Sequence, residues 1–398
     1  MKKENLYEIM NDIDEKYIAE AADINVCGGN RFRNYFKTWG LIAAGILLIA
    51  GIGLLTLPLN KNKKTTDNVS DLVALSIDMD SFFEANMGFE GLMAYDISEL
   101  MDESPWNKDI NIDTLPVFKN VYEAEGSGII KNPDIEKMCA VLYEISTRFE
   151  LSPSETAIEY LMGETDDGAE IPYAVSYTDN GITLEVESNL TTTVTFEPAL
   201  AIPEGYNNIY NASYEDVQKI AEYYKTTYAH LINMDAPVTN IGSGDYDIYA
   251  NQSYDLSYYE SSADFVTELL NNAFYRVQFY QNSDNSLNLI RFYRTDLSNL
   301  IGYYPIITWK KAEQLLTEGK YITTVPVDFP GAEYIRKTEL VYRNGHTEDT
   351  YMPYYRILVE LPDMHRKDTG LNTYGAYYVP AVKEEYLTNM PVWDGSFN

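Results

Sequence analysis

The stretch 173–196, YAVSYTDNGITLEVESNLTTTVTF, alternates apolar and polar residues around the turn Asp179-Asn180-Gly181. A period of two places alternate side chains on opposite faces of a strand, and an Asn-Gly pair is typical of a tight hairpin turn. The stretch therefore predicts antiparallel strands, with one buried face, at 173–177, 182–187 and 192–196.

Three amphipathic helices accompany such strands. The first is predicted to begin with Asn132 as its N-cap and Pro133 at its first position. The second starts from the capping pattern Ser213-x-x-Asp216, and the third starts at Thr308. Each helix precedes two or three predicted strands, so the sequence predicts an α+β fold in which antiparallel sheets are each packed by a helix. The later predicted strands are 246–260, 273–280, 287–294, 338–343, 354–361 and 374–382.

Residues 39–59 form a run of 21 residues without a charged side chain. A helix of this length spans about 31 Å, roughly the hydrocarbon thickness of a bilayer, and the run exceeds the apolar core of a cleaved signal peptide. The run predicts one transmembrane helix in the cell membrane, with a cytoplasmic N-terminus and an extracytoplasmic C-terminal part. Gly40 and Ala44 have the spacing of small-residue contacts, which predicts a weak dimer through this helix.

The predicted membrane segment divides the chain into unequal parts. Residues 1–38 are predicted to form a short, helical cytoplasmic head, and residues 60–70 form a linker. Residues 71–205 are predicted to form a first extracytoplasmic α+β module. Residues 206–398 then hold the remaining α+β structure, either as one module or as two that divide near residue 300.

Five apolar residues of the head follow helical spacing, and nothing else within 1–38 is available to cover them. They are Leu6, Ile9, Met10, Ile13 and Tyr17. An exposed apolar stripe of this kind marks a protein-binding surface. The sequence therefore predicts that the head binds a cytoplasmic protein partner.

Composition and motifs exclude several classes of function. The formal net charge of −32 is unfavourable for binding nucleic acid, because its phosphates are also negatively charged. The 35 Tyr, 14 Phe and 4 Trp residues are sufficient to form a folded core. No Gly-x-Ser-x-Gly motif occurs, and the three His residues are too far apart in sequence for a helical zinc motif. Residues 109–120 begin like a calcium loop but carry Thr114 where Gly is needed and Asn120 where Glu is needed. The sequence thus predicts no catalytic residue, no metal site, no cofactor and no enzymatic activity.

Several segments carry a resemblance to a known group of proteins. The segments MGFEGLMAYDISEL (87–100), NIDTLPVFKN (111–120), PYYRILVELP (353–362) and GLNTYGAYYVPAV (370–382) resemble uncharacterised single-pass membrane proteins of Clostridia-type Firmicutes. The head is similar to those of membrane-bound anti-sigma factors, although a zinc-type head is excluded because Cys27 stands there without a second Cys or a His. Residues 307–361 are similar in pattern to PepSY-like and cystatin-like modules.

This resemblance implies a membrane-anchored regulatory or sensor protein. In that function an extracytoplasmic interaction domain is coupled to a head that binds a partner such as a sigma factor. Two alternatives stay open: a cell-envelope binding or scaffold protein without a signalling role, and, as a third choice, a membrane-anchored hydrolase.

Overall fold

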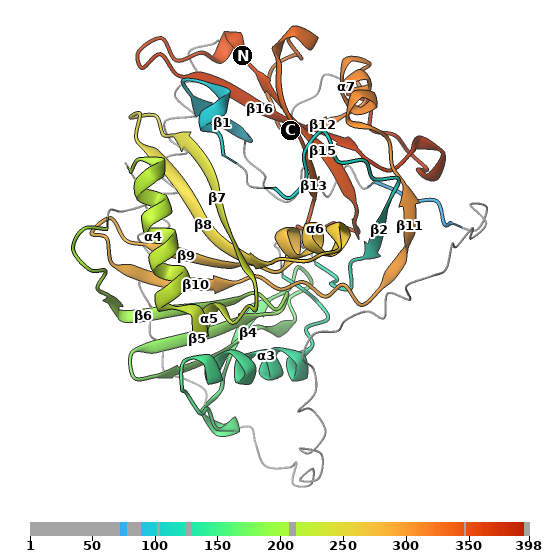
Figure 1. Ribbon diagram of the computed structural model, residues 1–398. Helices are drawn as coiled ribbons and strands as arrows, with labels where there is room; N and C mark the ends of the chain where they lie inside the picture. The colour runs from blue at the N-terminus through green and yellow to red at the C-terminus, as the bar shows by residue number, and fades with distance from the viewer. Residues whose placement is uncertain are drawn as a thin grey trace. The chain divides into compact units, whose positions relative to one another are not determined.

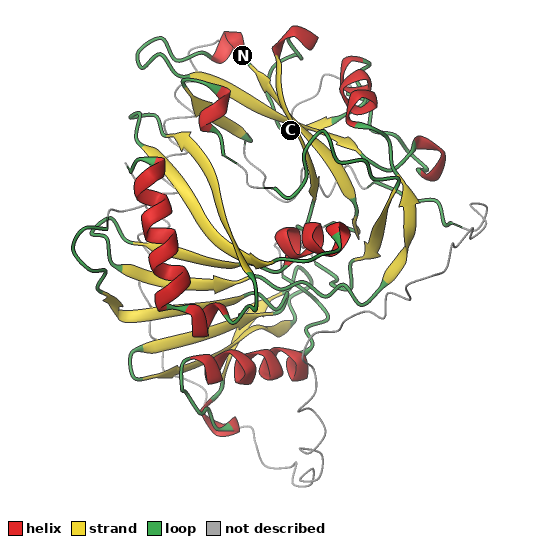
Figure 2. Ribbon diagram, in the orientation of Figure 1, coloured by secondary structure: helices red, strands yellow, loops and turns green. Residues whose placement is uncertain are grey.

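The computed structural model of the chain contains a compact unit at residues 68–398. The structure describes residues 72–77, 89–101, 104–124, 129–206, 212–345 and 348–393, which all belong to this unit. Within these ranges the chain forms sixteen strands in three sheets and five α-helices (Figure 2). The helices are α3 (Ile135–Arg148), α4 (Tyr214–Thr227), α5 (Ala229–Ile232), α6 (Phe265–Phe274) and α7 (Trp309–Thr317).

All strand pairs within the three sheets are antiparallel (Figure 1). The eight-stranded sheet has the order β3 (Glu159–Glu164), β4 (Glu170–Asp179), β5 (Ile182–Glu187), β6 (Thr192–Leu200), β10 (Leu287–Phe292), β9 (Val277–Gln281), β8 (Gln252–Glu260) and β7 (Pro237–Tyr246). The five-stranded sheet has the order β1 (Gly91–Ala94), β16 (Asn372–Pro380), β15 (Pro353–Glu360) and β13 (Ile335–Tyr342), and β12 (Ile322–Thr323) also pairs with β16. The three-stranded sheet has the order β11 (Leu300–Pro305), β2 (Thr114–Lys119) and β14 (Thr350–Tyr351).

One face of the eight-stranded sheet is apolar across seven strands. Residues that stand opposite one another in register form a single row: Tyr177, Leu184, Val194, Ile290, Phe279, Leu256 and Ile241. Helix α3 packs against β4 and β5, and α4 packs against β7 and β8. The apolar stripes of both helices pack against this row and form one hydrophobic core with it. The two helices therefore shield the apolar face of the sheet from water.

The opposite face of the same sheet is polar along the neighbouring row. That row consists of Ser176, Glu185, Thr193, Arg291, Gln278, Ser257 and Asn240. Because successive side chains of a strand point to opposite faces, the alternation in the sequence produces one apolar and one polar face. Burial raises the pKa of the Glu185 carboxyl, and the nearby charge of Glu187 contributes to the same shift.

Strand β16 is the centre of the five-stranded sheet, where it pairs with β1, β12 and β15. Gly375 permits the close approach of neighbouring segments, because a Cβ at this position would lie 2.5 Å from a methyl of Val325 and 3.0 Å from one of Leu361. Gly91 near the beginning of the described chain pairs with Gly375 near its end. The two ends of the domain are therefore held in one sheet.

The structure confirms several predictions from the sequence. Strands β4, β5 and β6 include the three predicted strands, and the turn between β4 and β5 has φ values of 53° at Asn180 and 76° at Gly181. Ser213 and Thr308 are the N-caps of α4 and α7, and each side chain accepts a hydrogen bond from a backbone N–H in the first turn.

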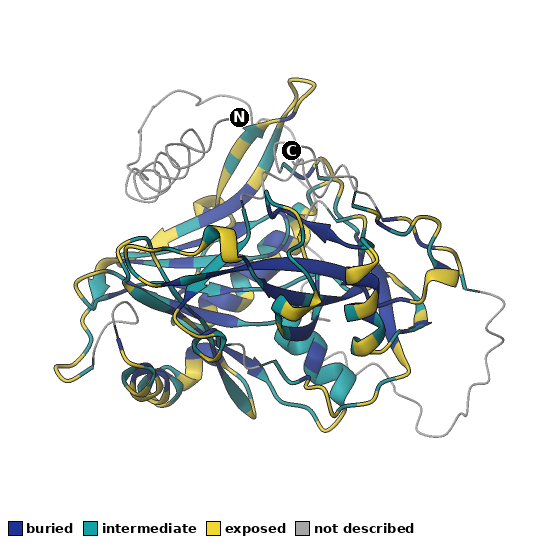
Figure 3. Ribbon diagram, turned by 90° about the horizontal axis from the view of Figure 1, so that it is seen from above, coloured by how far each residue is buried: buried dark blue, intermediate teal, exposed yellow. Residues whose placement is uncertain are grey.

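The predicted α+β class is wrong, because the described domain is mainly β. One core cluster contains no α-helical residue among those described, and it joins Val117 of β2 and Tyr304 of β11 to Leu358 of β15. A second cluster covers Ile357 and Val359, the neighbours of Leu358 on the opposite face of β15. Residues on both faces of β15 are thus buried, so another sheet covers part of the surface for which the sequence predicted helices. Figure 3 shows buried residues, in dark blue, along the inner strands of the molecule.

Individual elements also differ from their prediction. The N-cap of α3 is Asp134, whose side chain accepts from the Lys137 N–H, and not Asn132. The predicted strand 246–260 is interrupted, since β7 ends at Tyr246 and β8 begins at Gln252. Helix α6 was not predicted, although Asp264 caps it by accepting from the Thr267 N–H.

The predicted single-pass localisation in the cell membrane is corrected as well. In the ranges that the structure describes, no helix has the length and the apolar character needed to cross a membrane. The predicted segment 39–59, with its dimer contact at Gly40 and Ala44, lies outside those ranges, as do the head at 1–38 and the whole linker at 60–70.

Candidate functional site

A cavity of about 610 Å³ lies beside the five-stranded sheet. Its walls come from the loop between β12 and β13, from the short 3₁₀ helix η5 (Pro362–Met364) and from the end of the described chain. The lining residues are Pro326, Val327, Asp328, Pro330, Tyr334, Leu361, Pro362, Asp363 and Trp393. This volume falls within the range of about 300–1,000 Å³ that is typical of ligand pockets.

The pairing of the sheet brings these distant segments together. Strand β13 pairs with β15, and β15 leads directly into Leu361 and η5. The Trp393 N–H donates a hydrogen bond of 2.7 Å to the carbonyl of Gly319, which lies between α7 and β12, and so fixes the end of the described chain at this side of the cavity. The site is therefore built beside β15 and the edge strand β13 of the five-stranded sheet, although its lining comes from loops.

Aromatic packing holds one wall of the cavity. The ring of Trp393 stacks on that of Tyr321 with a centroid distance of 5.9 Å and an interplanar angle of 21°. Tyr321 in turn contacts Tyr377 of β16 edge to face at 5.1 Å. Burial raises the pKa of the Tyr321 hydroxyl to about 12, with a smaller contribution from the charge of Asp328. This wall is therefore neutral and apolar at physiological pH.

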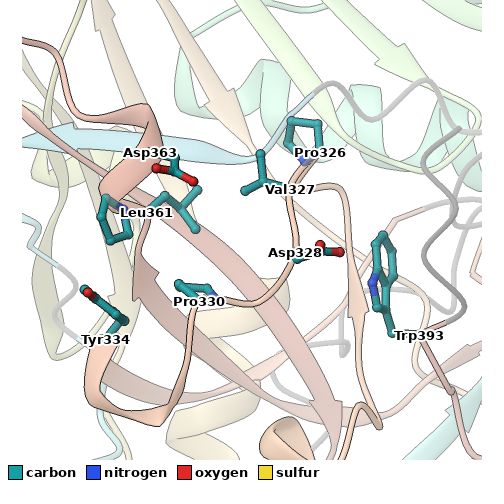
Figure 4. A pocket seen from close by; sticks show the side chains of 9 residues that line it. Pro326, Val327, Asp328, Pro330, Tyr334, Leu361, Asp363 and Trp393 are labelled. Carbon is teal, nitrogen blue, oxygen red and sulfur yellow. The ribbon is translucent and has the colours of Figure 1, made fainter. Parts of the chain in front are cut away.

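Two carboxylates give the cavity a negative charge. Figure 4 shows Asp328 next to Trp393 and Asp363 on the opposite side, beside Leu361. Both side chains belong to exposed residues, and no cation among the described residues lies within 4.0 Å of either carboxylate. The combination of carboxylates with a Trp ring attracts positively charged groups, because cations bind both carboxylates and the faces of aromatic rings.

The titratable side chains in the lining of this cavity are few. Besides the two carboxylates and Tyr334, the lining contains no His, Cys, Ser, Thr or Lys. Among the described residues, no three His, Cys, Asp or Glu side chains converge where they could hold a metal ion. The arrangement provides recognition by charge, ring faces and shape.

The sequence did not single out any residue of this cavity. The predicted partner-binding residues Leu6, Ile9, Met10, Ile13 and Tyr17 lie outside the described residues, so that site stays a prediction. The available signal was the segment PVDFPG at 326–331, where Pro and Gly mark a structured loop between strands.

No protein-family model matches the sequence, and no curated protein matches it. The resemblance to single-pass membrane proteins with anti-sigma-like heads therefore gains no support from known families, and no match supports the expected signalling character. The expected membrane character is corrected by the described ranges, which hold no helix suited to cross a membrane.

Proposed function

We propose that the protein is a non-enzymatic binding protein whose domain 68–398 recognises a basic peptide segment. The observation that carries this proposal is the 610 Å³ cavity, in which two carboxylates and a stacked Trp ring face a common space. An Arg or Lys side chain that enters the cavity gains contacts with both kinds of group. The formal net charge of −32 favours cationic partners in the same way.

A regulatory role is compatible with this binding function. In such a role the cavity receives one partner, while the head at 1–38 binds the second through its predicted apolar stripe. The first half of this arrangement is supported by the geometry of the cavity, and the second half rests on the sequence alone.

The proposal is tested by fluorescence polarisation with the full-length chain and a labelled tetra-arginine peptide. The double variant Asp328→Asn, Asp363→Asn should weaken binding by about 2- to 30-fold, since each partly exposed ion pair contributes about 0.2–1 kcal/mol. Trp393→Ala should weaken binding by about 2- to 5-fold through the loss of a cation–π contact. Binding should also weaken as the salt concentration rises.

A matched control separates the cavity from general charge attraction. The double variant Asp109→Asn, Asp235→Asn removes the same charge from exposed residues that do not line the cavity. It should bind the peptide within about twofold of the wild type. An equal loss in both double variants, or no binding by the wild type, would disprove peptide recognition by the cavity. A labelled oligosaccharide bound in place of the peptide would assign the cavity to sugars.

A further inference from the structure

A second cleft, of about 360 Å³, lies between the end of α6 and the five-stranded sheet. Its lining residues are Ser104, Leu269, Asn272, Ala273, Arg276, Leu340, Val341, Tyr342, Arg343, Asn344, Gly345, Arg356 and Tyr378. Three of these side chains are arginines, and none is a carboxylate. For a chain with a formal net charge of −32, this is an unusual local concentration of positive charge.

Two of the three arginines have carboxylate partners nearby. Arg343 Nη2 lies 2.6 Å from Glu348 Oε1, and Arg356 Nη2 lies 2.6 Å from Glu339 Oε2. Arg276 differs, because no carboxylate of the described residues lies within 4.0 Å of its guanidinium. Its Nε is buried and donates no hydrogen bond to a described residue.

A second donor in the same cleft also lacks an acceptor. Asn272 Nδ2 is buried without a hydrogen-bond partner among the described residues. Buried donors of native proteins nearly always have an acceptor, so two such donors that line one cleft require an explanation. A bound oxyanion supplies acceptor atoms for both.

The surroundings of Arg276 do not neutralise it fully. Arg276 comes two residues before Gln278 and so belongs to the polar side of the eight-stranded sheet. Asp255 is the carboxylate that interacts with it electrostatically, but Asp255 accepts its hydrogen bond of 3.2 Å from Gln278 Nε2. Burial raises the pKa of the Asp255 carboxyl, and the charge of Arg276 opposes this shift only in part. The ring of Tyr293 lies 5.5 Å from the guanidinium carbon.

The remaining wall of the cleft is apolar. Leu269 and Ala273 of α6 face it on one side, and Leu340, Val341 and Tyr342 of β13 line the other. The Tyr342 hydroxyl is already satisfied, since it donates to the Pro116 carbonyl at 2.9 Å. A ligand that fits this cleft therefore combines a negatively charged group with a small apolar body.

We propose that this cleft binds a small organic oxyanion through Arg276 and Asn272. The planar guanidinium offers two parallel N–H groups to a carboxylate or phosphate, and the Asn272 amide adds a third donor. The volume of about 360 Å³ is at the small end of the range for ligand pockets, so the ligand is a metabolite-sized acid. This site is separate from the peptide-binding cavity and involves none of its lining residues.

The test measures the thermal midpoint of the full-length chain with benzoate, phenyl phosphate or inorganic sulfate, each against sodium chloride of equal ionic strength. A ligand that binds only the folded state raises the midpoint, and the rise grows with the logarithm of its concentration once this exceeds the dissociation constant. At least one of the three anions should raise the midpoint, and its affinity should fall by about 10- to 100-fold in Arg276→Gln. Isothermal titration calorimetry gives the affinity directly.

Three further variants define the interaction. Arg276→Lys keeps the charge but loses the planar fork, and Asn272→Ala removes the third donor; both should weaken binding. Arg294→Gln removes an equal charge from an arginine that pairs with Glu144 outside the cleft, and it should bind like the wild type. A benzoate-only response identifies a carboxylate ligand, and a response to phenyl phosphate or sulfate identifies a phosphate-type ligand. No response to any anion, or an equal loss in Arg294→Gln, would overturn the proposal.

Discussion

Replacing Glu339 by glutamine tests how β13 and β15 hold opposite charges inside the five-stranded sheet. Glu339 is only 5% exposed, and it stands directly opposite Arg356 in the register of the two strands. Its Oε2 lies 2.6 Å from Arg356 Nη2, and its Oε1 lies 2.6 Å from Lys337 Nζ. The substitution removes the negative charge that both cations contact while the shape of the side chain is kept.

Removing one partner of a buried ion pair costs about 3–5 kcal/mol. The side chains of Lys337 and Arg356 are 28% and 26% exposed, so water compensates them in part and we expect the lower end, about 3 kcal/mol. Urea denaturation followed by tyrosine and tryptophan fluorescence should show a lower midpoint with an unchanged slope.

The pH dependence of this loss provides a second measurement. Burial alone would raise the pKa of Glu339, but the charges of Arg356 and Lys337 outweigh it, so the pKa is lowered. A carboxylate with a lowered pKa contributes stability above the ordinary glutamate pKa of about 4.3, and this contribution is lost as pH falls through the lowered value. The difference between the wild type and Glu339→Gln should therefore be largest near neutral pH and shrink in acid.

Glu360→Gln is the matched control, because Glu360 also pairs with an arginine at 2.6 Å, but at a more exposed position. Its loss should stay below about 1 kcal/mol. Equal losses in the two variants, or a loss below about 1 kcal/mol in Glu339→Gln, would refute the reasoning.

Two further substitutions test the core and a turn of the eight-stranded sheet. Phe279→Ala should cost about 3–5 kcal/mol in urea denaturation, because Phe279 is 1% exposed and stacks on Tyr224 at 4.7 Å, whereas Phe279→Leu should cost clearly less; equal costs would contradict the packing. Gly181→Ala should cost more than about 1 kcal/mol, since the backbone has a φ of 76° and the new Cβ would lie 2.1 Å from the Glu197 carbonyl oxygen. Gly168→Ala has a similar φ of 82° but no atom closer than 3.8 Å, so a loss as large as that of Gly181→Ala would disprove the role of the clash.

Local patterns in the sequence were sufficient to predict those strands and helices that have one apolar and one polar face. The alternation in 182–187 predicted β5 because Leu184 and Val186 enter the core while Glu185 lies on the polar face. The caps at Ser213 and Thr308 were predictable because a hydroxyl that accepts from the first turn is a local interaction. Helix α6 was missed although it has the same kind of cap at Asp264, since its ten residues stood among predicted strands.

The fold class and the candidate sites depend on long-range contacts that no local pattern contains. The weight of helices was overestimated because the burial of β15 against other strands follows from sheet packing and not from a helical stripe. Asp328, Asp363 and Trp393 come together only after β13, β15 and β16 have paired. Likewise, the lack of an acceptor at Arg276 is a property of its folded surroundings, so an arginine in the sequence gives no sign of it.

The pairing of β1 with β16 has a consequence for synthesis in the cell. A ribosome adds about 5–20 residues per second, so on the order of tens of seconds pass between the synthesis of Gly91 and that of its pairing residue Gly375. During that interval the five-stranded sheet lacks its central strand, and its apolar tyrosines and leucines stay available to chaperones or to other nascent chains. A stop codon shortly before Asn372 would leave this condition permanent, so quality control would recognise such a truncated chain as unfolded although most of its length is present.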